Sequence, residues 1–437
     1  MSTITSRPVN GRTNGSMNGN TNGHHKVRFI PLTYNQAESQ TSALRLILTL
    51  RPEWEDGKIE FVRFTDGITN TLLKVINKKP GLSDEEIDND AVLLRAYGQG
   101  TDLIIDRERE TQNHELLMQH NLAPVLLARF QNGMLYRFIR GAVTSPADLR
   151  RVDIWRAVAR RLAEWHAIVP CIPTPRESLT AEITGSEQFG MPAPTPSRKD
   201  PALQNAIDNV APGKPSPNVW TVMQKWIYAL PMETEAEKGR QASLQKELTR
   251  LVAEFSNRPG LGKNSLVFAH CDLLSGNVII QPRSANNANA PETVSFIDYE
   301  YATPSPAAFD IANHFAEWGG FDCEHDLLPT QSQRLDFIRE YIQSYFTQLG
   351  QPLSKTDEEA EVHRLFMEVD VWRGIPGFYW GIWALIQATI SQIDFDYASY
   401  AEIRLGEYWA WRAEADGSRK ASGKEMAVRE RRWAQES

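Results

Sequence analysis

The sequence predicts an α+β fold with two lobes, a small β-rich N-terminal lobe and a larger, mostly helical C-terminal lobe. Residues 58–137 alternate short β-branched and aromatic runs with turns, and one polar helical segment interrupts them. From Arg151 onward, apolar residues recur at helical spacing. The chain has 437 residues, 41% of them hydrophobic, which is enough for two lobes that each bury a core.

The N-terminal lobe is expected to span residues 26–140. Strands joined by tight turns, with one helix against them, form a small sheet of this kind. Its expected elements, in chain order, are a helix at 40–50, strands at 58–64, 71–77 and 91–98, a polar helix at 106–121, and the strand pair "VLLARFQNG" and "MLYRFIRG". Residues 1–25 are rich in Asn, Gly, Ser and Thr and have almost nothing to bury, so we expect a disordered tail there.

The C-terminal lobe is expected to span residues 141–437. Its first helix, at 151–169, places Trp155, Val158 and Leu162 on one face. Residues 170–220 contain ten of the 25 prolines, so they are expected to be a surface insertion without packed elements. The apolar stretch at 377–390 is shorter than the roughly 20 residues of a membrane span and is expected to be a buried helix.

Composition limits the classes of partner and the cellular compartments that we expect for this protein. A net charge of −8 disfavours nucleic acid and anionic membranes, because both attract basic surfaces. The three cysteines form no CxxC pair, so neither a disulfide framework nor a zinc site is indicated. The N-terminus carries no signal-type apolar segment. We therefore expect a cytoplasmic protein, without a membrane segment, that binds a small molecule or another protein.

The stretch "LVFAHCDLLSGNVII" (266–280) breaks a buried apolar run with polar residues, and it predicts a hairpin whose loop carries Asp272 and Asn277. The strand "VSFID" ends in Asp298, and Glu300 can point to the same face. Such an oxygen-rich cluster suits Mg²⁺, a hard cation. Phosphoryl transfer requires this arrangement, because catalysis there depends on positioning and on neutralising charge. A metal-dependent hydrolase would use the same residues, but it would leave the first lobe without a purpose.

Three longer stretches resemble the choline/ethanolamine kinases, within the wider group of protein-kinase-like and aminoglycoside-phosphotransferase-like enzymes. They are "FAHCDLLSGNVII", "SFIDYEYATPSPAAFDIANHFAEW" and "FYWGIWALIQATISQIDFDYASYAEIRL". The resemblance runs from about residue 64 to near residue 409. It implies a protein-kinase-like fold, ATP and Mg²⁺ as co-substrate and cofactor, and transfer of the γ-phosphate to a small amino-alcohol. It also leaves a homodimer open.

The resemblance gives roles to the residues around the polar loop. Asp272 resembles the catalytic aspartate, Asn277 and Asp298 resemble the metal ligands, and Glu300 resembles a supporting acid. This chain has Cys271 where the family usually has Asn, and we expect a small neighbour with its side chain turned away from Asp272. His270 is expected to pack under the loop.

The first lobe contains the residues that resemble the nucleotide site. In "TDGITN", Gly67, Thr69 and Asn70 match the loop over the phosphates, although the family commonly has two glycines and a plain hairpin turn would look alike. Arg95 matches the basic residue of the third strand, and Glu110 matches its helix partner. Because Glu108 and Glu115 lie nearby in the sequence, it stays open which glutamate of this helix pairs with Arg95. Without the resemblance, Arg95 would be interpreted as a strand-edge charge and Glu110 as part of a solvated face.

The remaining matches concern an aspartate that supports the catalytic loop and the residues of the amine pocket. Asp310 matches an aspartate that braces the catalytic loop, although it could equally cap its own helix. Glu317 follows two turns later on the expected substrate side. The family's aromatic amine pocket is matched by Trp380, Trp383 and Tyr400, and the alternative for these rings is an ordinary core stripe.

Ethanolamine is the expected substrate. Choline-directed members usually continue past "EW" with bulky aromatics, whereas this chain has "EWGGFDCEHD", and a primary ammonium has three N–H donors to satisfy. The stretch around Asp310 is also similar to fungal ethanolamine kinases. The product would be phosphoethanolamine, in the first step of the CDP-ethanolamine route to phosphatidylethanolamine. The alternatives are a choline or dual-specificity kinase, an aminoglycoside-type phosphotransferase, and a catalytically silent nucleotide-binding scaffold.

Overall fold

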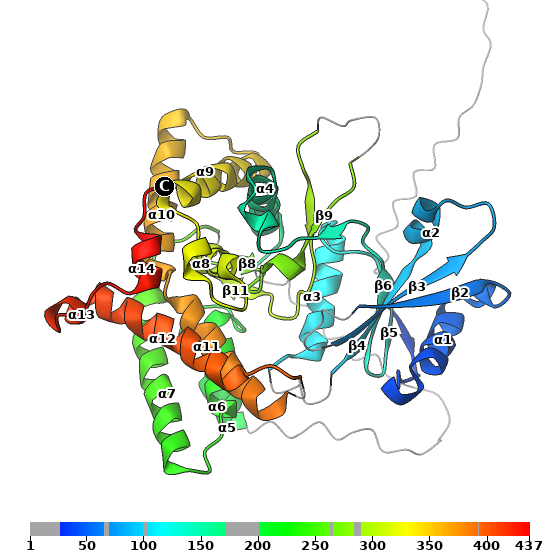
Figure 1. The fold of residues 1–437 in the computed structure, drawn as a ribbon, viewed down its shortest axis with the longest axis horizontal. Helices are drawn as coiled ribbons and strands as arrows, with labels where there is room; N and C mark the ends of the chain where they lie inside the picture. The colour runs from blue at the N-terminus through cyan, green and yellow to red at the C-terminus, as the bar shows by residue number, and fades with distance from the viewer. Residues whose placement is uncertain are drawn as a thin grey trace, which may run out of the picture.

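The computed structural model describes residues 27–64, 70–98, 104–171, 201–262, 265–283, 290–391 and 393–437. Within these ranges the chain forms two lobes, the first built on a β-sheet and the second mainly on helices (Figure 1). The expected α+β, two-lobed architecture is confirmed. The tail at 1–25 and the loop at 65–69, which includes Gly67 and Thr69, lie outside the described residues.

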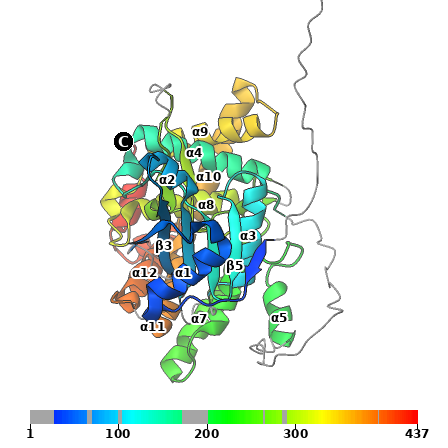
Figure 2. The same ribbon diagram turned by 90° about the vertical axis from the view of Figure 1, so that its right-hand side faces the viewer.

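A six-stranded sheet forms the first lobe, in the order β1-β5-β6-β4-β3-β2. Its elements are β1 (Arg28–Ile30), α1 (Ser39–Leu50), β2 (Lys58–Phe64), β3 (Asn70–Lys78), α2 (Asp84–Asp90), β4 (Val92–Tyr97), α3 (Arg107–Gln119), β5 (Leu126–Phe130) and β6 (Gly133–Arg137). α1 covers the sheet face turned away from the second lobe, which is the near face in Figure 2. There Leu46 and Trp54 pack into one apolar cluster with Val75 and Leu94 of the sheet.

The polar helix α3 joins the two lobes, with the sheet on one side and the second lobe on the other (Figure 1). Several of its polar side chains are buried there, and one of them, Asn113, donates through Nδ2 to the carbonyl oxygens of Tyr299 (3.3 Å) and Ala302 (2.9 Å). Arg109 Nη2 donates to Thr303 Oγ1 at 2.8 Å. A buried helix can be this polar because the second lobe supplies its hydrogen-bond partners.

The second lobe contains most of the helices. Its elements are β7 (Ala142–Val143), α4 (Val152–Ile168), α5 (Pro201–Asp208), α6 (Val219–Ala229), α7 (Glu235–Phe255), β8 (Val267–Ala269), β9 (Val278–Ile280), β10 (Val294–Phe296), β11 (Thr303–Ser305), α8 (Ala307–Ala316), α9 (Gln331–Gln348), α10 (Lys355–Trp372), α11 (Ile375–Ile390), α12 (Tyr397–Ala415), α13 (Ser418–Ala421) and α14 (Val428–Trp433). The apolar stretch at 377–390 is the buried helix α11, as expected. None of the helices in the described ranges combines the length and the apolar character that a membrane span requires.

Two short sheets hold the polar loop, and their pairing differs from the expected hairpin. β8 pairs with β11, whereas β9 pairs with β10 and β7. The prediction that the two halves of 266–280 pair with each other is therefore wrong. Neighbouring apolar runs often form hairpins, but here β8 and β9 each pair with strands from earlier or later parts of the chain instead of with each other.

Residues 201–220 also depart from expectation, because they contain packed elements. α5 occupies 201–208, and Ala211, Val219 and Trp220 are buried in the core of the second lobe. Asn218 begins α6 by accepting the backbone N–H groups of Trp220 and Thr221. The prolines at 212, 215 and 217 stand in the connection between α5 and α6, where no helical hydrogen bond is lost.

Two glycines of α11 allow α12 to approach closely. A Cβ on Gly377 would lie 2.6 Å from the carbonyl oxygen of Arg404, and one on Gly381 would lie 2.6 Å from Leu405 Cγ. Because glycine has no side chain at these positions, α12 can pack closely against α11. This close packing helps to bury Tyr400 and Arg404 of α12.

Gly377→Ala is expected to destabilise the protein by about 1–3 kcal/mol, because the added methyl group meets a backbone oxygen that has no room to move. Thermal melts check this. Gly406→Ala is the matched control, since a Cβ at Gly406 of α12 would meet no atom within 4 Å. Alanine favours a helix by about 1 kcal/mol over glycine, so the control should melt at the same or a higher temperature. Equal melting temperatures for both variants would contradict the close approach.

Candidate active site

Asp310 supports the loop that carries Asp272. Its carboxylate accepts the backbone N–H groups of His270 (2.9 Å) and Cys271 (2.7 Å). His166 Nε2 of α4 lies 2.9 Å from the same carboxylate, and its Nδ1 lies 2.7 Å from the Tyr341 hydroxyl. Burial acts to raise the pKa of Asp310, but these hydrogen bonds hold it below its usual value. The alternative that Asp310 caps its own helix is wrong, because its amide partners belong to the loop.

Cys271 and His270 have structural environments. Cys271 is fully buried, its Sγ lies 3.3 Å from Ser305 Oγ, and burial raises the pKa of its thiol. It adopts a φ of 63°, a left-handed conformation that is uncommon for residues other than glycine. His270 Nε2 lies 3.0 Å from the Ile297 carbonyl oxygen, and burial lowers the pKa of the ring. A buried, protonated thiol is a poor nucleophile.

Asp272 lies at the centre of the loop and is 7% exposed. Asn277 Nδ2 donates to its backbone oxygen at 2.7 Å and to its Oδ2 at 3.1 Å. Burial raises the pKa of Asp272, and the negative charges of Asp298, Glu317 and Glu300 raise it further. A carboxylate with a raised pKa is a stronger base, which suits a group that accepts a proton from a hydroxyl.

A charge cluster joins the two lobes above this loop. Arg95 of β4, 5% exposed, is paired through Nε with Glu110 Oε1 at 3.2 Å and through Nη2 with Asp298 Oδ1 at 2.8 Å. Its Nη2 also contacts Glu300. The structure therefore brings Arg95 and Glu110 together with the two acids that follow β10, although about 200 residues separate them. Glu110 is 2% exposed, which excludes the interpretation that it belongs to a solvated helix face.

Arg107 belongs to the same cluster, and the sequence analysis missed it. Its Nη1 lies 2.9 Å from Glu110 Oε2 and 3.3 Å from Glu300 Oε2, and its guanidinium lies over the Tyr97 ring at 4.3 Å. Asn70 Nδ2 donates to Glu300 Oε2 at 3.3 Å. The sequence offered one weak signal, which is the i, i+3 spacing of Arg107 and Glu110 on α3.

The charge balance of the cluster suits a polyphosphate with a divalent cation. Two guanidinium groups face three carboxylates, and Asp272 adds a fourth nearby. Among the described residues, no three His, Cys, Asp or Glu side chains form a self-sufficient metal centre. The carboxylate and amide oxygens of Asp298 and Asn277 are hard donors, and Mg²⁺ usually completes its coordination with water and phosphate oxygens. The donor set thus fits that ion.

The aromatic residues are linked to the same loop. Asn313 Nδ2 donates to the Cys271 carbonyl oxygen at 2.9 Å, and its Oδ1 accepts Trp380 Nε1 at 2.8 Å. Trp383 Nε1 donates to the Tyr301 hydroxyl at 2.8 Å. The Trp380 ring packs edge-on against both Tyr301 and Trp383, with centroids 5.6 and 5.5 Å away. Both tryptophans are therefore core residues, and Asn313 links Trp380 directly to the loop that carries Asp272.

Glu317 and Tyr400 meet at Arg404, which the sequence analysis did not single out. Arg404 Nη2 lies 3.2 Å from Glu317 Oε1, and Arg404 Nη1 donates to the Tyr400 hydroxyl at 3.4 Å. Burial raises the pKa of Glu317, while Arg404 opposes that rise. The half-exposed Phe321 packs against Tyr400, with centroids 6.1 Å apart, so one aromatic ring follows the two glycines of "EWGG".

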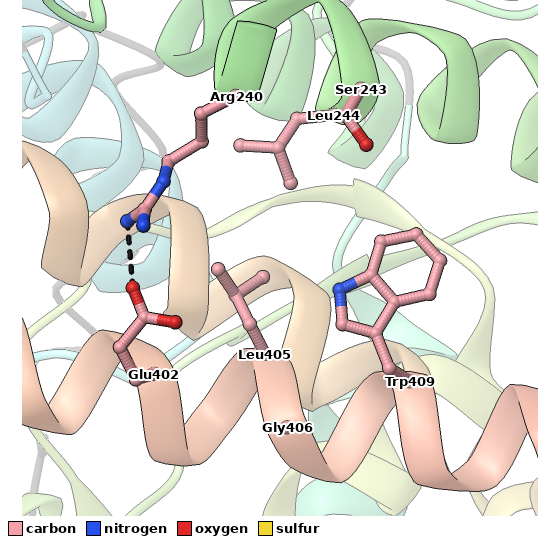
Figure 3. A pocket seen from close by; sticks show the side chains of 7 residues that line it. All are labelled: Arg240, Ser243, Leu244, Glu402, Leu405, Gly406 and Trp409. Carbon is pink, nitrogen blue, oxygen red and sulfur yellow. Dashed lines mark ion pairs between the residues drawn. The ribbon is translucent and has the colours of Figure 1, made fainter. Parts of the chain in front are cut away.

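A surface cavity of about 270 Å³ lies elsewhere, between α7 and α12 (Figure 3). Arg240 and Glu402 form a 2.7 Å ion pair across it, and Leu405 and Trp409 line its floor. It contains none of the candidate residues. The chemistry of the Asp272 loop, rather than this hollow, therefore identifies the site.

Comparison with known proteins agrees with the geometry. The sequence model of one family, described as choline/ethanolamine kinase, matches residues 61–409. Human ethanolamine kinase 1 is 31% identical over 382 residues, which cover 85% of this chain and 72% of that protein. The Drosophila melanogaster ethanolamine kinase is 30% identical over 468 aligned residues, with coverages of 89% and 80%.

Solved structures give the same result. The ethanolamine kinase of Plasmodium vivax is 25% identical, superposes with a TM-score of 0.60, and covers 86% of this chain and 89% of that one. The choline kinase of Cryptosporidium parvum, at 22% identity and a TM-score of 0.54, shares the fold over 86% of this chain and 97% of that one. The chain belongs to the choline/ethanolamine kinase family of small-molecule kinases.

Proposed function

We propose that the protein transfers the γ-phosphate of ATP to the hydroxyl of ethanolamine and forms phosphoethanolamine. The observation that carries the proposal is that the buried Asp272 lies within electrostatic reach of Asp298 and Glu300, which pair with Arg95, and also of Glu317, which pairs with Arg404. The relatives at about 30% identity are ethanolamine kinases, which supports this amine as the substrate.

In this mechanism each group of residues has a defined task, and Asn277 has two. Asp272 accepts the hydroxyl proton, and Asn277 fixes its orientation through two hydrogen bonds. Arg95 and Arg107 attract the phosphates, and Glu110 holds Arg95 in place. Asp298 and Asn277 would hold Mg²⁺, which neutralises phosphate charge when it is bound. Asn70 would contribute beside the phosphates, and Gly67 and Thr69 remain predictions because they lie outside the described residues.

Glu317 supports ethanolamine over choline. A primary ammonium needs hydrogen-bond acceptors, whereas a quaternary ammonium needs only an aromatic enclosure. Glu317 is buried beside Tyr400 and offers a carboxylate to the amine. The test is ATP consumption with ethanolamine, with choline, and without an amine. Faster turnover on choline at low concentration would favour the choline alternative, and equal consumption without amine would exclude kinase activity toward either.

The wider context of the reaction stays a prediction. A role at the start of the CDP-ethanolamine route and a homodimer follow from the family resemblance, and a cytoplasmic location follows from the cysteine content and the N-terminal sequence. Labelled ethanolamine in cell extracts, fractionation and light scattering would test the three in turn.

Trp383→Ala is expected to raise the KM for ethanolamine several-fold while the KM for ATP hardly moves. A cation–π contact in such a site contributes roughly 1 to 2 kcal/mol, which corresponds to about a fivefold to thirtyfold change in affinity. Because Trp383 is 5% exposed and packs against Trp380 and Tyr397, the variant should also lose about 3–5 kcal/mol of stability. Kinetics are therefore measured well below the melting temperature of the variant.

Trp409→Ala is the control, since Trp409 is 40% exposed on α12. This variant should change neither the KM for ethanolamine nor the KM for ATP. An ethanolamine effect of Trp383→Ala no larger than its ATP effect would remove Trp383 from the substrate site.

A further inference from the structure

The chain continues beyond the family match, which ends at residue 409, and the extra segment packs on the second lobe. Figure 1 shows α14 in red beside α10 and near α12. Trp433 is buried and donates through Nε1 to Asp370 Oδ1 at 2.6 Å. The backbone N–H groups of Gln331 and Ser332 at the start of α9 donate to the carbonyl oxygens of residues 435 and 436. The C-terminal segment is thus a fixed part of the lobe.

Arg429 of α14 begins a line of alternating charges that ends at the amine site. Its Nε lies 4.0 Å from Glu407 Oε2, and that oxygen lies 3.3 Å from Arg404 Nε. Arg404 Nη2 in turn lies 3.2 Å from Glu317 Oε1. All four side chains are at most 8% exposed, so water screens these charges weakly.

Neighbouring groups fix the direction in which each member points. His325 Nε2 lies 2.7 Å from Glu407 Oε1, which leaves Oε2 directed at Arg404 and Arg429. Arg429 Nη2 donates to the Arg373 carbonyl oxygen at 2.7 Å, and its Nη1 lies 3.3 Å from Glu430 Oε1.

Removing the positive charge of Arg429 would leave Glu407 with His325 on Oε1 and Arg404 on Oε2, so that Glu407 and Glu317 would share the single guanidinium of Arg404. Two carboxylates that share one guanidinium in a buried site repel each other, so one of them moves or takes up a proton. Glu317 is the member nearest the candidate amine site. Its position and its charge therefore depend on a residue of the C-terminal segment.

We propose that Arg429 is a positioning residue for the amine, acting through Glu407 and Arg404 on the carboxylate of Glu317. This inference rests on the proposed function, because it assigns Glu317 to the bound ammonium. It extends that function to a segment outside the family match.

The test compares Arg429→Gln, Arg429→Lys and Arg431→Gln. Arg429→Gln removes the charge and keeps a donor of similar reach, so the KM for ethanolamine should rise about fivefold or more while the KM for ATP stays within about twofold. Arg429→Lys keeps the charge and should recover most of the affinity. Arg431 lies on the same helix with its side chain 56% exposed, and its substitution should change neither constant.

A second comparison separates positioning from general damage. In a Glu317→Gln background, Arg429→Gln should cause no further rise in the KM for ethanolamine, because the target of the charge is gone. If Arg429→Gln folds poorly, the pair Arg429→Gln and Glu430→Gln removes one charge of each sign, and the same selective rise is expected of it.

Three results would overturn the inference: equal changes in both KM values, equal effects of Gln and Lys at Arg429, or additive effects of the Arg429 and Glu317 substitutions. Wild-type protein that does not phosphorylate ethanolamine would overturn the proposed function, and the inference with it. Active wild-type protein with an unchanged KM in Arg429→Gln would overturn the inference alone.

Discussion

Asp272→Asn is expected to lower turnover at least about a hundredfold while the affinity for ATP stays close to that of the wild type. The amide keeps the shape of the side chain but cannot accept the hydroxyl proton. The residues proposed to bind the nucleotide pair around Arg95, with Glu110 and Asp298 as its partners, and the substitution should leave these contacts intact. Steady-state turnover and direct ATP binding measure the two quantities. Asp336→Asn on the exposed surface of α9 is the control and should be silent.

The pH profile gives this prediction a second readout. Burial and the charges of Asp298, Glu317 and Glu300 raise the pKa of Asp272, and only the ionised carboxylate accepts a proton. Turnover should therefore fall as the pH drops through this raised pKa, in a range well above the value of about 4 for a free aspartate. The residual activity of Asp272→Asn should lack this acid limb. A variant that keeps near-wild-type turnover would show that Asp272 is not the base.

Local patterns in the sequence were sufficient for most of the first lobe. β2 matches its expected range, and β3 and β4 differ from theirs by one residue at each end, because alternating β-branched runs between turns fix them locally. The pairing of β8 and β9 could not be predicted in this way. Their partners β10, β11 and β7 come from other parts of the chain, and strand periodicity does not reveal which edges meet.

The site residues also divide into those that local sequence patterns predict and those that they do not. Asp272 and Asp298 follow strand ends and Asn277 immediately precedes a strand, so all three stand out in the sequence, whereas the Arg95–Glu110 pair followed only from the family resemblance. Two buried charges on a strand and on a polar helix look like surface residues until their partners are known.

His166, Arg107 and Arg404 were missed for a related reason. Each lies on a helix at a position typical of core packing or of a solvated face. Each acquires its task from a group more than 80 residues away: Asp310 for His166, Glu300 for Arg107, and Glu317 for Arg404.

Asp298→Asn is the second substitution for which we expect a large effect, a loss in kcat/KM of about a hundredfold to a thousandfold, together with a higher Mg²⁺ requirement. The wild-type carboxylate is the charged member of the proposed ligand pair, and the charge stabilisation that a metal supplies to a transition state amounts to several kcal/mol. Asn is preferred to Ala here, because residue 298 has a φ of 65° and Asn tolerates the left-handed region.

The structure also predicts what Asp298→Asn should not do. Arg95 keeps Glu110 and Glu300 as partners, so the buried guanidinium remains paired and the melting temperature should fall little. Activity is therefore titrated with Mg²⁺ at saturating ATP, and melts are recorded on the same samples. A Mg²⁺ curve that superimposes on that of the wild type would show that Asp298 is not a ligand. A large loss of melting temperature with an unchanged Mg²⁺ requirement would instead make it a structural partner of Arg95, and the metal would then have to bind through other oxygens of the loop.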